Sequence, residues 1–355
     1  MLRTKLKDWL LKFPQHIKLP HFSANELYEK GMLFLNSWWQ LLVISIAALF
    51  LLYYPLGGLL VSNIDRNTTY DINEGHPEQS STVEMESFII NREVNDKIWT
   101  PKLPFFYPSY FLDNMPNFQL GMFNGLSKFA SSFAKRHAPR IKDNEEESDL
   151  TAAAELLRYP GTIWMFSSEN KLLLSPSANN QYRKARRHLI NYNKKLSNGE
   201  LTFYKTPADL AYILNKTGIN LNKSSEILEN HIREESSSWW DNKADNVFYY
   251  QQGKAYTYYL LLKALGNDYK EIIVNAELYP EWTSLLKALE DAASVQPFVV
   301  RNGEINSLTA PNHLSYLNMY INKAYGKISR IVQKLKHAQV KQKEKINADR
   351  NSKNA

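Results

Sequence analysis

The feature that most constrains this chain is a long stretch without any charge. No Asp, Glu, Lys or Arg occurs between Gly31 and Ile64, and Leu41 to Leu60 is almost wholly apolar. At a rise of about 1.5 Å per residue, such a segment crosses a hydrocarbon core about 30 Å thick. A cleaved signal peptide has a shorter apolar run that starts nearer the N-terminus. The sequence therefore predicts one transmembrane helix over residues 38–61.

Basic residues beside this run predict its orientation. Lys and Arg are frequent before it, whereas the twenty residues that follow Ile64 contain only Arg66. Because short segments rich in Lys and Arg stay on the cytoplasmic side of a membrane, residues 1–37 should be cytoplasmic. The remainder should be exported. We therefore expect a single-pass bacterial inner-membrane protein whose bulk lies in the periplasm.

The N-terminal residues carry an amphipathic pattern. Leu2, Leu6, Trp9 and Phe13 recur at helical spacing with basic residues between them, and Pro14 ends the pattern. One interpretation is a helix that lies in the plane of the anionic inner leaflet. The other is a frayed tail that only carries the topology signal. The lipid bilayer is an expected partner in either case.

Composition excludes several classes of protein. The chain has no Cys, which removes disulfides, thiolate zinc sites and cysteine nucleophiles. Its net charge of +7 is unevenly spread, because Lys323 to Ala355 contains ten Lys and Arg while Asp65 to Asp96 contains eight acids. A nucleic-acid partner is not expected outside the cytoplasm, so the basic end is better suited to lipid headgroups or acidic polymers. No cofactor is expected.

The exported part should be mainly α. Residues 62–82 are polar and acidic and predict a tether, and residues 339–355 predict a basic disordered tail. Residues 83–338 predict a helical domain, in which the charged residues 142–149 are either a subdomain break or a disordered insert. One or two short β-hairpins are expected, over residues 162–174 and around Val299 to Gly303. Apolar periodicity predicts helices over residues 83–98, 116–136, 178–196, 206–216, 223–235, 244–265, 268–275 and 279–293.

The last helix has the clearest pattern. Apolar residues from Leu314 to Ala338 alternate three and four positions apart through more than three heptads, and Pro311 lies near the start, where proline is tolerated. Such a seam packs either against its own domain or against another chain. Self-association through residues 311–338 is therefore one of two alternatives.

Standard catalytic motifs are absent. The sequence has no nucleophile elbow, Walker A loop, dinucleotide fingerprint or zincin motif. His231 near Glu234 is the nearest metal-like spacing, but no third ligand follows, so no metal site is predicted. The alternative chemistry is a peptidoglycan hydrolase or lyase that uses Glu234, Glu235 or Asp241 beside Trp239 and Trp240, because an acid against an aromatic wall acquires a raised pKa.

Binding candidates are aromatic or basic. Tyr and Trp suit sugar rings and protein interfaces, and clustered Arg suits phosphate, although a core helix and a solvated helix face explain the same patterns. The aromatic candidates are Trp99, Phe105, Tyr107, Trp239, Trp240, Tyr249, Tyr250 and Tyr256, and the basic candidates are Arg183, Arg186 and Arg187.

Several strings resemble one known family. They include Trp99-Thr-Pro, Pro104-Phe-Phe-Tyr-Pro108, Leu112-Asp-Asn-Met-Pro-Asn-Phe-Gln119, Tyr159-Pro-Gly and Gln181-Tyr-Arg-Lys-Ala185. In these the chain resembles the bacterial domain-of-unknown-function family 2333, uncharacterised inner-membrane proteins of Gram-negative bacteria, over roughly Trp38 to Arg330. The resemblance implies the predicted topology and brings no activity, cofactor or catalytic residue.

These observations favour a bitopic inner-membrane protein whose periplasmic helical domain is a non-catalytic interaction or scaffold module. Its expected partner is an envelope protein or peptidoglycan. The carboxylate hydrolase is the alternative, and a membrane-surface adaptor that uses both basic ends is a third hypothesis.

Overall fold

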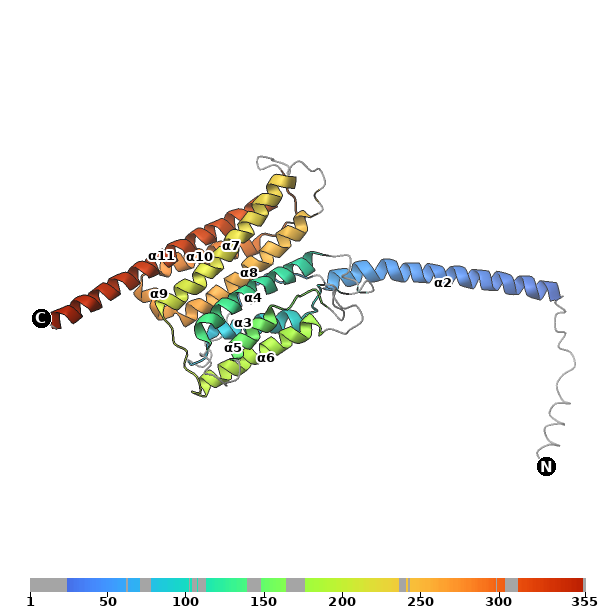
Figure 1. Cartoon of the computed structure of the whole chain (residues 1–355). Coiled ribbons are helices and arrows are strands. Elements are labelled where there is room, and N and C mark those ends of the chain that lie inside the picture. The colour runs from blue at the N-terminus through green and yellow to red at the C-terminus, as the bar shows by residue number, and fades with distance from the viewer. Residues whose placement is uncertain are drawn as a thin grey trace, which may run out of the picture. The chain divides into compact units, whose positions relative to one another are not determined.

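The computed structural model describes residues 24–61, 63–70, 78–101, 103, 107, 113–138, 148–163, 176–235, 241, 243–297, 299–303 and 312–353. The chain divides into two compact units, Met1–Pro55 and Leu56–Ala355. The first carries most of helix α2, and the second is a domain of packed helices (Figure 1).

Helix α2 runs over Ala24–Val61. Within the part of the chain that the structure describes, Trp38–Gly58 is the one helical segment long and apolar enough to cross a membrane, with a mean hydropathy of 2.0. Its large apolar side chains are exposed, and Leu51 reaches 73%. The prediction of one apolar N-terminal helix is confirmed. The amphipathic pattern of residues 2–14 lies outside the described residues.

The second unit is built of helices alone among its described residues, which confirms the mainly α prediction. Figure 1 shows the long helices lying roughly side by side. Their bounds are α3 Ser81–Asn91, the π-helix η1 Arg92–Asp96, α4 Asn114–His137, α5 Asp149–Leu157, α6 Ala178–Ser197, α7 Pro207–Glu235, α8 Ala244–Asp268, α9 Lys270–Asn275, α10 Tyr279–Ser294 and α11 His313–Lys353.

The β-hairpin prediction is wrong where the structure tests it. Residues 299–303 form no strand, and Arg301 instead exchanges hydrogen bonds with His313 at the start of α11. An isolated two-stranded hairpin is only marginally stable in water. The N–H and C=O groups of Arg301 instead form hydrogen bonds at the start of a helix, where backbone N–H groups lack helical partners. Most of the other expected hairpin, residues 164–174, lies outside the described residues.

Helices α4 and α8 form the centre of the domain through glycines. A Cβ added at Gly121 would lie 1.9 Å from the carbonyl oxygen of Tyr250, and one at Gly253 would lie 2.2 Å from that of Phe118. No side chain other than hydrogen fits such an approach. The two backbones therefore pack closely, and α8 becomes almost fully buried from Phe248 to Leu262.

The seam of α11 packs inside the chain. Its apolar residues from Leu314 to Leu335 are buried, and α11 contacts α7 and α10. Of the two alternatives for this pattern, the structure contains the intrachain one. Helix α11 then continues to Lys353, where the sequence analysis expected a disordered tail from residue 339. Lys, Gln, Glu and Ala are good helix formers, which accounts for the extension.

Helix α3 is fixed at its start by two distant helices. The buried carboxylate of Asp268, at the end of α8, accepts hydrogen bonds from the Ser80 hydroxyl and from the backbone N–H groups of Ser81 and Thr82. Asn193 of α6 exchanges hydrogen bonds with the Ser80 backbone. Because first-turn N–H groups lack helical partners, this capping both satisfies them and sets the direction of α3.

Candidate functional site

Residues 63–70 lie against the domain as an extended segment, which we call the strap. Three side chains of α8 donate to its backbone carbonyl oxygens: Tyr256 to Asn67 at 2.7 Å, Tyr259 to Thr68 at 3.3 Å and Lys263 to Tyr70 at 3.0 Å. These donors are three and four residues apart, so they share one face of α8. The segment expected to begin a tether is therefore bound to the domain over these residues.

The guanidinium of Arg92 occupies the centre of this contact. It donates to the hydroxyl of Tyr256 at 2.6 Å and to the carboxylate of Glu93 at 2.7 Å, and it lies 3.8 Å from the carboxylate of Asp65. It also lies over the rings of Tyr70 and Tyr256. Arg92 therefore joins the π-helix, α8 and the strap through a single buried side chain.

Glu93 is held from the other side by Gln119 of α4. The amide nitrogen of Gln119 donates to Glu93 at 3.0 Å and to the carbonyl oxygen of Ile98 at 3.1 Å. Its amide oxygen accepts from both the backbone and the hydroxyl of Thr100. The chain that leaves η1 is thus bound to α4 by a fully buried amide. Single π-helical turns often occur at functional sites. This one carries Arg92 and Glu93, which we group with Asp65, Gln119 and Tyr256 as the polar cluster.

The strap is also bound through Arg66. Its Nε donates to the side-chain oxygen of Gln252 at 3.0 Å, and its guanidinium lies over the rings of Phe118 and Tyr249. Gln252 in turn donates to the carbonyl oxygens of Ala293 and Val295, at the end of α10. The strap therefore makes contacts that extend to α4 and α10.

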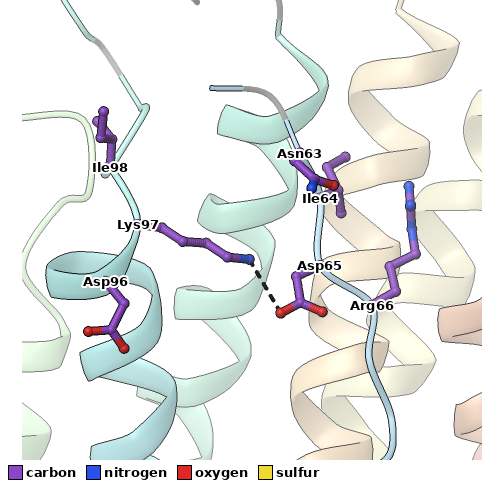
Figure 2. Close-up of a pocket in the computed structure, with 7 residues that line it drawn as sticks. All are labelled: Asn63, Ile64, Asp65, Arg66, Asp96, Lys97 and Ile98. Carbon is purple, nitrogen blue, oxygen red and sulfur yellow. Dashed lines mark ion pairs between the residues drawn. The ribbon is translucent and has the colours of Figure 1, made fainter. Parts of the chain in front are cut away.

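A pocket of about 530 Å³ opens beside this cluster, between the strap and the end of η1 (Figure 2). Lys97 spans it toward Asp65, with its Nζ 3.6 Å from that carboxylate and 3.5 Å from Glu93. Ile98 is 47% exposed at its rim. The lining residues are Asn63, Ile64, Asp65, Arg66, Asp96, Lys97 and Ile98.

The charges of the pocket are balanced and partly desolvated. Burial by itself raises the pKa of Asp65, but hydrogen bonds from Tyr70 and Asn67 and the charges of Arg92 and Lys97 outweigh it and lower that pKa. Burial likewise opposes the charge of Arg92, yet Glu93, Tyr256 and Asp65 hold its pKa above the usual value. Both groups stay charged at neutral pH. The pocket is therefore polar, and Asp65 and Arg92 beside it keep opposite charges.

A family model described as an uncharacterised protein conserved in bacteria (DUF2333) matches part of this chain. Residues 104–234 match this family. The resemblance inferred from the sequence motifs is thereby confirmed. Neither a curated protein nor a solved structure matches the chain.

The DUF2333 match covers helices α4 to α6 and nearly all of α7, while the strap, η1 and α8 lie outside it. Arg183, Arg186 and Arg187 lie inside the matched stretch, on α6. Arg183 donates to the side chain of Asn95 and to the carbonyl oxygen of Val94, so it binds the π-helix. Arg187 is exposed and Arg186 is half-buried.

The aromatic candidates separate into buried and peripheral residues. Trp99 is buried, donates to the carbonyl oxygen of Gly161 at 2.9 Å and packs edge-on against Phe123. Tyr249 and Tyr256 are buried in contact with the strap, and Tyr250 is half-buried. Tyr107 is half-buried too. Phe105, Trp239 and Trp240 lie outside the described residues.

The carboxylate candidates do not converge in the described part of the chain. Glu234 is exposed on α7, and the side chain of Glu235 lies outside the described residues. Asp241 lies 2.8 Å from the imidazole of His231 and also accepts from Asn302. Both partners of the His231 pair are largely buried, so the pair joins the end of α7 to the residues just before α8. Among the described residues, no group of His, Asp and Glu has the arrangement of a metal site.

Proposed function

We propose that the chain is a single-span inner-membrane protein with a cytoplasmic N-terminus, whose exported helical domain is a non-catalytic interaction module. The observation that supports this most is what the polar residues around Arg92 contact. Each of them binds another segment of the same chain, and the pocket above them presents balanced charge beside an exposed Ile98. Such a surface suits binding and lacks an activated nucleophile or a general base.

The strap gives this module a close connection to its anchor. The apolar helix ends at Val61, and Asp65 and Arg66 already bind the domain. A few residues of chain therefore link membrane and domain. We propose that the pocket is presented to another envelope protein.

Topology and partner are tested together in cells. A photoreactive residue at Ile98 should give discrete crosslinks to one envelope protein, because Ile98 is exposed at the rim of the pocket. The same residue at Val274, which is exposed on α9 away from the pocket lining, is the matched control. Equal products at both positions, or domain residues shielded from protease in spheroplasts, would contradict the proposal.

The carboxylate hydrolase remains a competing hypothesis because Asp241 and His231 form a pair. Two observations weigh against it: that pair is largely buried, and Glu234 lies on an exposed helix face. Its test is the release of soluble fragments from purified peptidoglycan by the full chain. Release that disappears in a Glu234→Gln, Glu235→Gln and Asp241→Asn variant would establish the hydrolase.

A further inference from the structure

Lys254 is a buried lysine that the strap and the pocket do not use. It lies on α8, where α4 and α7 both contact that helix, and its residue is only 5% exposed. Helix α4 comes close to α8 here because Gly125 faces the Lys254 backbone. A Cβ added at Gly125 would lie 3.5 Å from the carbonyl oxygen of Lys254. A lysine is rarely buried to this degree unless it has a partner. The absence of an apolar residue at this position therefore calls for an explanation.

Four other lysines flank this point in regular spacing. Lys128 and Lys135 are seven residues apart on α4, and Lys216 and Lys223 are seven residues apart on α7. Seven residues are about two helical turns, so each pair lies on one face of its helix and about 10 Å apart along the axis. Helices α4 and α7 contact each other, and both contact α8.

The lysines form two levels. At one level Lys135 and Lys216 both lie over the ring of Tyr212, at 5.8 and 5.6 Å. At the other, Lys128 and Lys223 both act electrostatically on Lys254. The two helices therefore run antiparallel with one cationic centre about 10 Å from the next. We call these five residues the lysine groove, a name for the set of side chains and not for a cavity.

The lysine groove lacks counterions among the residues that the structure describes. None of its five ammonium groups has a carboxylate within ion-pair distance there, although Asp209 pairs nearby with Arg136 at 2.6 Å. Burial, with the charges of Lys128 and Lys223, lowers the pKa of Lys254 to about 8, so at neutral pH it still carries most of its proton. Lys254 is buried while Lys128, Lys135 and Lys223 are exposed, so the groove joins one desolvated cation to cations that an external anion can reach.

We propose that the lysine groove binds a ligand with two phosphate groups, one at each level. Ammonium groups bind phosphate as point charges, and several of them can surround one phosphate without the fixed fork of arginine. The ring of Tyr212 offers an apolar face beside the outer level. The site goes beyond the proposed function, since it lies on other helices than the strap pocket.

The test uses the full chain in detergent and three probes. Inorganic phosphate offers one group, a short linear inorganic polyphosphate offers several over about 10 Å, and monomeric dihexanoylphosphatidic acid offers a lipid headgroup. Binding is measured by calorimetry at fixed ionic strength. We expect polyphosphate to bind at least about tenfold more tightly than inorganic phosphate, since both levels contribute. A tighter interaction with the phosphatidic acid, which has a single phosphate group, would contradict a ligand with two phosphates.

Three variants and one control separate the groove from general positive charge. Lys128→Gln with Lys223→Gln, Lys135→Gln with Lys216→Gln, and Lys254→Met should each weaken polyphosphate binding by about tenfold, as expected for lost charge-assisted hydrogen bonds. Lys323→Gln with Lys327→Gln removes two lysines of α11 outside the groove and should leave affinity within about twofold.

Lys254→Met supplies the sharpest readout. Removing a buried cation from beside two like charges should raise the melting temperature while it removes the binding, a combination that lost folding cannot produce. The proposal is overturned if the α11 control weakens binding as much as the groove variants do, or if polyphosphate binds no more tightly than inorganic phosphate.

Discussion

The phenol oxygen of Tyr256 lies 2.6 Å from a guanidinium nitrogen of Arg92, which donates to it, and the same phenol donates to the carbonyl oxygen of Asn67 in the strap. One hydroxyl group therefore links α8, the π-helix and the segment that follows the apolar helix.

Replacing Tyr256 by Phe should loosen the strap. The change leaves the Arg92 donor and the Asn67 carbonyl without their partner, at a cost of about 1–3 kcal/mol of unfolding free energy. We expect faster amide hydrogen exchange in residues 63–70 and a lower midpoint of denaturant unfolding. Tyr258→Phe is the matched control, because that buried hydroxyl has no hydrogen-bond partner among the described residues. Equal effects of the two variants would contradict the role given to Tyr256.

Replacing Gly253 by Ala should disrupt the contact between α4 and α8. The new methyl group would overlap the carbonyl oxygen of Phe118, so we expect a loss of more than about 2 kcal/mol in unfolding free energy. Gly326→Ala on α11 meets no atom within 4 Å and should instead stabilise the protein by about 0.5–1 kcal/mol through helix propensity. Chemical denaturation of the pair tests both signs.

Replacing Glu86 by Gln should stabilise the domain at high pH. Burial raises the pKa of Glu86 to about 8 from a usual value near 4.5. The folded state therefore retains a proton that the unfolded chain releases, and stability falls as pH rises from about 4.5 to 8. The variant should gain more than about 2 kcal/mol over the wild type at pH 8 and much less at pH 5. Exposed Glu271→Gln should show no such pH-dependent gain.

Protonation of His137 should destabilise the protein in acid. Burial is the main cause that lowers its pKa to about 4, and its imidazole lies 2.8 Å from the Tyr269 hydroxyl. Burial favours the neutral ring, so its contribution to the unfolding free energy is complete above about pH 6.5. As the pH falls toward 4, the unfolding free energy should decrease by at most about 3 kcal/mol. In His137→Gln this part of the pH dependence should vanish, whereas Tyr269→Phe should retain it because the burial remains.

The helices could be predicted from sequence because their apolar periodicity is strong. Residues 178–196 and 279–293 were expected as helices, and α6 and α10 occupy nearly the same positions. The expected break around Gly218 was wrong, since α7 is continuous there. Gly218 lies close to Ile328 of α11, so its small size serves packing. Local propensity could not reveal that tertiary contact.

The polar cluster was harder to predict. Tyr256 was singled out for its aromatic character, but Arg92, Gln119 and Asp65 were not, because their partners lie on segments far away in sequence. A signal did exist: Arg92 and Glu93 follow an apolar helix face directly, where two adjacent charges would be costly unless paired. The lysine groove gave no signal either, since it needs the crossing of three helices.

The strap is bound to α8 largely by its carbonyl oxygens, which every amino acid possesses. Substitutions at Asn67, Thr68 and Tyr70 should therefore leave the carbonyl acceptors in place. Substitutions of Tyr256, Tyr259 or Lys263 would instead remove the side chains that donate these hydrogen bonds. Across homologues, the mark of this attachment should be invariant side chains on one helix facing a partner segment of variable sequence.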